Sequence, residues 1–358
     1  MDCICVRWSR HVRGGTNFPL SLITNSNLKD KFIFCEKFDR KIVRKFNYFV
    51  YVDLFTDDGS ENNEVLNEVL FLNDNNKSVF YLESNDSAEV RYPQFVRYFK
   101  LWFKKQLYRD LNNYLKPFYG GTVYSDFYIN EYDLNKNNIY CSKVMDCNDL
   151  VKLDLFWNIL IGPYPIKRFK QSLLRKGISI FGANYLALLG PRILKMEDRS
   201  FPKRLFCHGR FSGPGIYTES IGYQRYLLLK EIQNDESILT GYITQKEYNR
   251  ELAQCQVVLS PFGWGEICHR DAEAIHNKGL LLKPNMDHIR TIPNIYESDK
   301  MYISINWDLS NLQEVFKSLK VNSEQIEKLS NEAYQFLKEE TNSFDKYVLS
   351  FYNKLISH

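Results

Sequence analysis

The sequence lacks the motifs that mark several large protein classes. Neither a GxGxxG dinucleotide fingerprint nor a P-loop GK[ST] occurs in its 358 residues. Its eight cysteines form no CxxC pair and match no zinc-ligand spacing. No apolar run approaches the roughly 20 residues that a membrane span requires, and no internal repeat is present. These absences argue against a P-loop nucleotide site, a structural zinc site and a transmembrane protein.

An excess of charge of one sign is also missing. The formal net charge is only +4, which is too small to predict a nucleic-acid partner. The stretch Met1–Arg13 is polar and basic, so we expect no signal peptide. Cys207 and Cys255 lie in or beside apolar runs, where a thiol behaves as a small hydrophobe, and this favours a reducing compartment. We therefore expect a cytoplasmic protein, with peripheral membrane association left open.

Short apolar runs alternate with longer helical patterns, which is typical of an α/β fold. The length predicts two domains of about 150–200 residues each. We place an N-terminal domain at 1–165, a linker at 166–202, a C-terminal domain at 203–340 and a terminal helix at 341–358 that could pack back on the first domain. The expected strands are Lys31–Cys35, Tyr48–Leu54, Val79–Glu83, Leu205–His208, Val257–Ser260 and Leu280–Lys283. The expected helices of the second half are Tyr223–Ile232, Ile267–His276, Ser323–Lys338 and Phe344–Ile356.

The segment from Tyr92 to Phe118 carries apolar residues at helical spacing, with Lys and Arg on the opposite face. This pattern predicts an amphipathic helix whose apolar face packs on the core. An interfacial helix that docks on a membrane bearing a lipid-linked acceptor is an alternative. A basic, aromatic helix that contacts nucleic acid is a second alternative, which would require a steep salt dependence of binding.

The stretch Val257–Ile275 carries the most chemical information. An apolar strand ends at Ser260, a loop with two glycines follows, and a helix begins directly afterwards. Ligands of open α/β sheets bind outside the carboxyl ends of strands, and a helix N-terminus favours a phosphate. His269 and Arg270 would oppose the helix dipole unless an anion is present. We therefore expect this corner to hold a phosphate group.

Further polar residues follow the same edge of the predicted sheet. Glu266 could accept hydrogen bonds from sugar hydroxyls, Glu273 from ribose hydroxyls, and Asp287 and His288 could also face the sugar. Arg210 and Lys283 end strands where they could reach the phosphates. The predicted donor-binding residues are Arg210, Gly263, Trp264, Gly265, Glu266, His269, Arg270, Glu273 and Lys283. The predicted catalytic residues are Asp86 and Glu83, as first and second choice of general base after the strand Val79–Leu82, together with Glu266.

A resemblance adds to this interpretation. The run SPFGWGEICHRDAEAI at 260–275, followed by GLLLKPNMDHI and YISINWDLSNL, resembles the C-terminal half of exostosin-like and related bacterial and viral GT-B glycosyltransferases. The resemblance covers about residues 201–312 and implies two Rossmann-like domains that face each other across a cleft. Glu266 and Glu273 are one position closer than the acidic pair common in retaining enzymes, so retention and inversion both stay open.

The same resemblance implies an activity. The chain would transfer a hexose or pentose from a nucleotide-sugar donor, UDP- or GDP-linked, to a glycan or glycolipid acceptor in polysaccharide biosynthesis, with no cofactor and no bound metal. The alternative is a non-catalytic nucleotide-sugar or glycan-binding module of a larger polysaccharide-synthesis system. Nucleic acid is not an expected partner.

Overall fold

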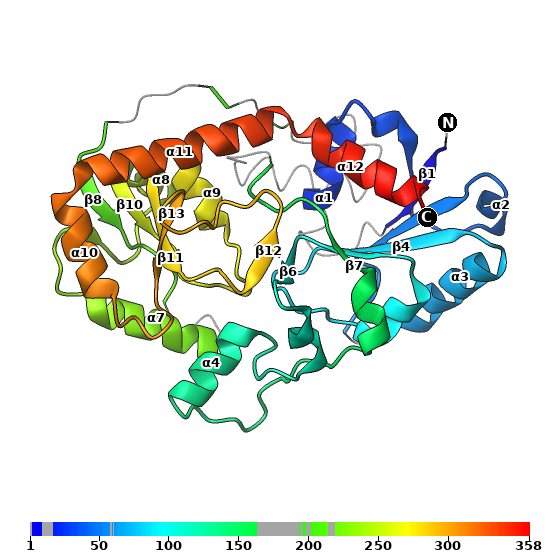
Figure 1. Ribbon diagram of the computed structural model, residues 1–358, viewed down its shortest axis with the longest axis horizontal. Coiled ribbons are helices and arrows are strands. Elements are labelled where there is room, and N and C mark those ends of the chain that lie inside the picture. Colours follow the sequence, from blue (N-terminus) through cyan, green and yellow to red (C-terminus); the bar gives the residue numbers. More distant parts are fainter. Residues whose placement is uncertain are drawn as a thin grey trace.

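The computed structural model describes residues 2–8, 17–57, 59, 61–162, 193, 196–197, 202–213 and 219–358. These residues form two α/β units, each built around its own parallel sheet (Figure 1). The predicted α/β class with two Rossmann-like domains is therefore confirmed. Nearly all of the predicted linker 166–202 lies outside the described residues.

The N-terminal unit contains a six-stranded sheet whose strands all run parallel, in the order β2-β1-β3-β4-β5-β7. Its central strands are apolar and buried on both faces, as expected for a parallel sheet covered by helices. The strands are β1 (Ile4–Arg7), β2 (Phe32–Cys35), β3 (Tyr48–Val52), β4 (Ser78–Glu83), β5 (Trp102–Lys104) and β7 (Leu153–Leu155). The helices are α1 (Asn17–Asn25), α2 (Arg40–Val43) and α3 (Asn62–Asp74), with short 3-10 helices η1 (Lys29–Lys31) and η4 (Cys147–Lys152).

The C-terminal unit contains a five-stranded parallel sheet in the order β13-β11-β10-β8-β9. The strands and helices predicted for this half are confirmed within a few residues at their ends, whereas α8, α10, β9 and β13 were not predicted. The strands are β8 (Leu205–His208), β9 (Ile238–Leu239), β10 (Cys255–Leu259), β11 (Leu280–Pro284) and β13 (Tyr302–Ile305). The helices are α7 (Glu219–Ile232), α8 (Gln245–Gln254), α9 (His269–His276), α10 (Leu312–Val321) and α11 (Ser323–Asn342).

The amphipathic helix predicted between Tyr92 and Phe118 is wrong. This segment instead forms η2 (Pro93–Tyr98), β5, β6 (Gln106–Tyr108) and η3 (Leu111–Leu115). Its aromatic residues are buried on more than one side, and Trp102 stacks on Tyr81 with ring centroids 4.0 Å apart. A run that is apolar all round satisfies a helical pattern as readily as a strand pattern. The interfacial helix and the nucleic-acid helix both required an amphipathic helix over this segment. The segment does not form that helix.

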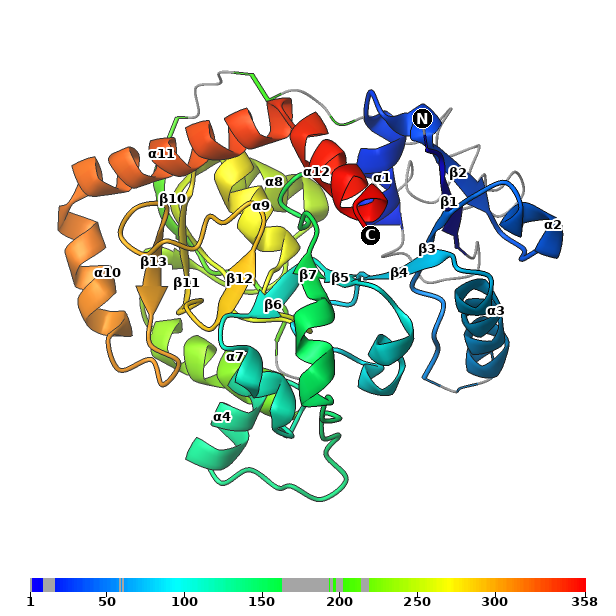
Figure 2. The same ribbon diagram turned by 45° about the vertical axis from the view of Figure 1, so that its right-hand side comes forward.

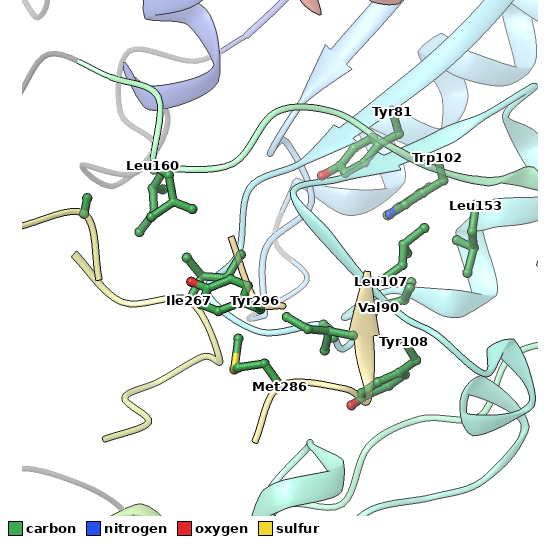
Figure 3. Close-up of a cluster of buried hydrophobic side chains, with 14 of the residues drawn as sticks. Tyr81, Val90, Trp102, Leu107, Tyr108, Leu153, Leu160, Ile267, Met286 and Tyr296 are labelled. Atoms are coloured by element: carbon green, nitrogen blue, oxygen red, sulfur yellow. The ribbon is translucent and has the colours of Figure 1, made fainter. Parts of the chain in front are cut away.

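The two units are joined by a small antiparallel ribbon and by a shared core. Strand β6 pairs with β12 (Ile289–Thr291), so one strand comes from each half of the chain. Figure 3 shows Tyr108 of β6 and Met286 of the C-terminal unit within one cluster of buried side chains. The same cluster continues into both units, through Trp102 on one side and Ile267 on the other. The junction is thus packed like the interior of a single domain.

Two helices cross between the units. Helix α4 (Val123–Glu131) belongs to the first half of the chain but packs on α7, where Gln224 donates a hydrogen bond to the Tyr128 hydroxyl at 3.0 Å. In Figures 1 and 2, α11 runs along the C-terminal unit and α12 (Asp345–Ile356) returns to the N-terminal unit beside α1. There Phe351 packs edge-on against Phe103 with ring centroids 4.9 Å apart. None of the helices in the described ranges is long and apolar enough to span a membrane.

Candidate functional site

The carboxyl ends of the two parallel sheets meet. The loop 84–91 follows β4 and the loop 260–268 follows β10, and the two loops are in direct contact. A Cβ atom on Gly265 would lie 1.7 Å from the Asp86 carbonyl oxygen, so only glycine permits this approach. We expected Gly265 to allow close approach of a ligand, but it allows close approach of the Asp86 backbone instead. Ligands of α/β folds bind at this edge, and here both edges contribute to one site.

Buried polar groups gather where the loops touch. The side chain of Glu266 is fully buried, and its Oε2 accepts hydrogen bonds from the Ala88 amide at 3.0 Å and from Gln106 Nε2 at 2.8 Å. Its Oε1 has no hydrogen-bond partner among the described residues, and His288 Nε2 lies 3.9 Å from it. Both ring nitrogens of His288 and Oε1 of Gln106 are likewise unpaired within that set. Buried groups of this kind are normally satisfied by ligand hydroxyls or ordered water.

The first turn of α9 is capped by its own aspartate. Asp271 accepts a hydrogen bond from the Cys268 amide at 3.0 Å and pairs with Lys283 Nζ at 3.2 Å, both side chains being fully buried. Hydroxyls of Ser260 and Tyr296 also donate to this carboxylate, at 2.6 and 2.7 Å. Lys283 is therefore engaged in neutralising Asp271. Its predicted contact with phosphate finds no support in this arrangement, because the ammonium group already pairs with a fully buried carboxylate.

Arg270 lies beside this capped turn in a different environment. Its Nη1 lies 3.4 Å from His208 Nδ1, and its guanidinium group lies over the Tyr248 ring, 5.7 Å from the centroid. Burial, followed by the charges of Arg270 and Arg210, lowers the pKa of His208 to about 3. His208 is therefore neutral at physiological pH and adds no second positive charge beside Arg270. Across the described residues, Arg270 forms no ion pair with a carboxylate.

Two other predicted donor ligands already have protein partners. Arg210 Nε lies 2.6 Å from Glu251 Oε2, and its Nη1 donates to the Thr240 carbonyl, which ties β8 to α8 and the segment after β9. Glu273 accepts a hydrogen bond from the Tyr248 hydroxyl at 2.9 Å. Donor contacts by Arg210 and Glu273 stay predictions and would require these bonds to be exchanged.

The predicted catalytic acids of the N-terminal unit differ sharply in exposure. Glu83 is 2% exposed and accepts a hydrogen bond from Trp102 Nε1 at 2.7 Å, while Lys104 Nζ lies 3.0 Å from its other oxygen. Both oxygens of this carboxylate therefore have protein partners, and this geometry favours a structural role over the predicted catalytic one. The Asp86 side chain is 68% exposed and lies 3.4 Å from Lys105 Nζ. Asp86 can therefore reach a substrate.

The remaining predicted residues flank the start of α9. Trp264 is 52% exposed in the glycine loop, and the Gly263 carbonyl accepts a hydrogen bond from the Tyr124 hydroxyl at 3.0 Å. Partial desolvation lowers the pKa of His269; the charge of Lys105 lowers it further, whereas Glu273 and Asp86 raise it. His269 is thus close enough to the N-terminal unit to sense its charges.

The comparisons with known proteins give the following results. No protein-family model and no curated protein matches the sequence. Among solved structures, the chain is similar to a glycosyltransferase from Rickettsia africae at 8% identity, with 99% of each chain covered and a TM-score of 0.44. It is similar to HepE of Anabaena, solved in complex with UDP-glucose, at 8% identity, with 98% of this chain and 100% of that chain covered and a TM-score of 0.47. Because these TM-scores lie below 0.5, the fold assignment rests on the sheet topology described above.

Proposed function

We propose that this protein is a metal-independent glycosyltransferase of the GT-B type, which transfers a sugar from a nucleoside-diphosphate donor to a glycan or glycolipid acceptor. One juxtaposition carries the proposal. Arg270, a cation without a carboxylate partner in the described structure, lies in the first turn of the helix that follows the loop of Glu266. The buried Oε1 of Glu266 has no hydrogen-bond partner among the described residues. A nucleotide-sugar combines an anionic diphosphate with a hydroxyl-rich ring. Arg270 matches the diphosphate of such a substrate, and Glu266 matches the hydroxyls of its sugar ring.

The chemistry follows from this placement. Cleavage of the bond between the anomeric carbon and the diphosphate oxygen builds negative charge on the departing diphosphate. The N-terminus of α9 together with His269 and Arg270 would stabilise that charge. Glu266, His288 and Gln106 would bind sugar hydroxyls, and Asp86 would act as general base if the reaction inverts.

The finer parts of the proposal rest on the sequence resemblance. These are a UDP- or GDP-linked donor, a hexosyl or pentosyl group, a role in polysaccharide biosynthesis and a cytoplasmic location. Peripheral membrane contact is not included, because the amphipathic helix that suggested it is replaced by strands and 3-10 helices.

A donor panel tests the proposal. The full chain is incubated with UDP-, GDP-, ADP- and CMP-sugars, and release of the free nucleotide is followed with and without glycan acceptors. We expect slow donor hydrolysis or transfer with at least one donor, and loss of that turnover in Glu266→Gln. Tight donor binding without turnover would instead support a binding module. Failure to bind any nucleotide-sugar or nucleotide would overturn both interpretations.

A further inference from the structure

Two consecutive buried lysines at the end of β5 differ in how their charges are compensated. Lys104 Nζ lies 3.0 Å from Glu83 and donates to Asn85 Oδ1 at 2.6 Å, so its charge has a buried counter-ion. The side chain of Lys105 is also only 2% exposed, yet its ammonium group has one partner in the described chain, Asp86 Oδ1 at 3.4 Å. Water surrounds that exposed carboxylate and weakens its attraction. A buried cation normally has stronger compensation than this.

The position of Lys105 suggests which group supplies the missing negative charge. Lys105 lies in the link between β5 and β6, at the carboxyl edge of the N-terminal sheet. Its backbone carbonyl accepts a hydrogen bond from Thr291 Oγ1 at 3.1 Å, and the next residue, Gln106, donates to Glu266. The link is therefore fixed against the C-terminal unit at the Lys105 backbone and at the next residue. The charge of Lys105 also lowers the pKa of His269 in the first turn of α9, after the larger effect of desolvation.

We propose that Lys105 is a substrate-binding residue that contacts the donor diphosphate from the N-terminal unit, opposite His269 and Arg270. The inference rests on the proposed function and extends it. A phosphate oxygen replaces Asp86 as the partner of the ammonium group, so that cations from both units hold one anion. The Asp86 carboxylate, freed from its ion pair, is then available to the acceptor hydroxyl. If the reaction inverts, donor binding in this way frees the general base.

Nucleotide binding by the full chain tests the inference. Calorimetric titrations with UDP, GDP and ADP, and with uridine, guanosine and adenosine, are compared between wild type and Lys105→Met. We expect Lys105→Met to weaken binding of the preferred diphosphate about tenfold or more, with the matching nucleoside unchanged. Lys105→Arg should recover part of the loss. Lys100→Met, which removes an exposed lysine near the same strand, serves as the matched control and should bind like wild type.

The outcomes separate the two proposals. If wild type binds and uses a nucleotide-sugar while Lys105→Met binds the diphosphate equally well, the role of Lys105 is wrong and the proposed function stands. If wild type binds no diphosphate, both fail. Should Lys105→Met not fold, Asp86→Asn gives an independent readout, because removal of the competing carboxylate should tighten diphosphate binding severalfold. Unchanged or weaker binding in Asp86→Asn would overturn the inference.

Discussion

Lys283 and Arg270 lie at the same edge of the C-terminal sheet, yet their surroundings are opposite. Lys283 is enclosed with Asp271, and hydroxyl groups complete the hydrogen bonds of that pair. Arg270 contacts a neutral histidine and the face of an aromatic ring. Both cations were predicted to bind phosphate because of where they stand in the sequence. The comparison shows that position at a sheet edge is not sufficient, and that the counter-charge separates a structural cation from one that is available to a ligand.

The largest effect should come from breaking the enclosed pair. Lys283→Met leaves the buried Asp271 carboxylate without its cation, and we expect the free energy of unfolding to fall by about 3–5 kcal/mol. Urea denaturation followed by circular dichroism measures this change. A loss below about 1 kcal/mol would mean that the pair is hydrated and that Lys283 resembles Arg270 after all.

Arg270→Ala should give the converse result. We expect kcat/KM for the donor to fall on the order of 10²–10³-fold, since a charge-stabilising group at the leaving diphosphate is lost. The free energy of unfolding should change by less than about 1 kcal/mol, because no ion pair is broken. Arg270→Lys, which keeps the charge but loses the planar fork, should retain part of the activity. A near-normal rate in Arg270→Ala would remove the phosphate role.

Glu89 carries a partly buried carboxyl group, and it extends the comparison of cations to a group that carries negative charge. Burial raises the pKa of Glu89 to about 7 from 4.5, against the opposing effect of a hydrogen bond from Tyr140. The folded chain therefore binds more protons than the unfolded chain between these two values, so stability falls as pH rises through this window and levels off above it. We expect a decrease of roughly 1–3 kcal/mol, measured by urea denaturation from pH 4 to 8. Glu89→Gln should flatten that part of the profile, and an unchanged profile would contradict the assignment.

Local patterns were enough to predict much of the fold. The strand Leu205–His208 and the β10–loop–α9 segment follow from short apolar runs bounded by glycine and polar residues. The segment 92–118 failed because its aromatic residues are buried on several sides, which hides the period of the strands. Helix α8 was missed although Thr244 and Glu247 form a capping box there, a signal that the sequence does contain.

The candidate site was predictable only in part, for a related reason. His269 and Arg270 were predicted from the sequence because their conflict with the helix dipole is local, and their contact with phosphate stays a prediction. Gln106 and Lys105 could not, since they come from the other unit and reach the site through the pairing of β6 with β12. The ion pairs of Lys283 and Glu83 were also hidden, because their partners Asp271 and Lys104 are brought to them by tertiary contacts.

The smallest effect is expected at the surface, where a cation has a partner but also has water. Arg97 Nη2 lies 3.4 Å from Asp146 Oδ2, and both of these side chains are exposed; Arg97 Nε also lies 4.0 Å from Oδ2 of the buried Asp149. Arg97→Ala should lower the free energy of unfolding by less than about 1 kcal/mol and leave donor turnover unchanged. Comparison of Arg97→Ala with Lys283→Met and Arg270→Ala covers three cations that differ in burial and counter-charge. If Arg97→Ala destabilised the protein as much as Lys283→Met, burial of an ion pair would not determine how much that pair contributes to stability.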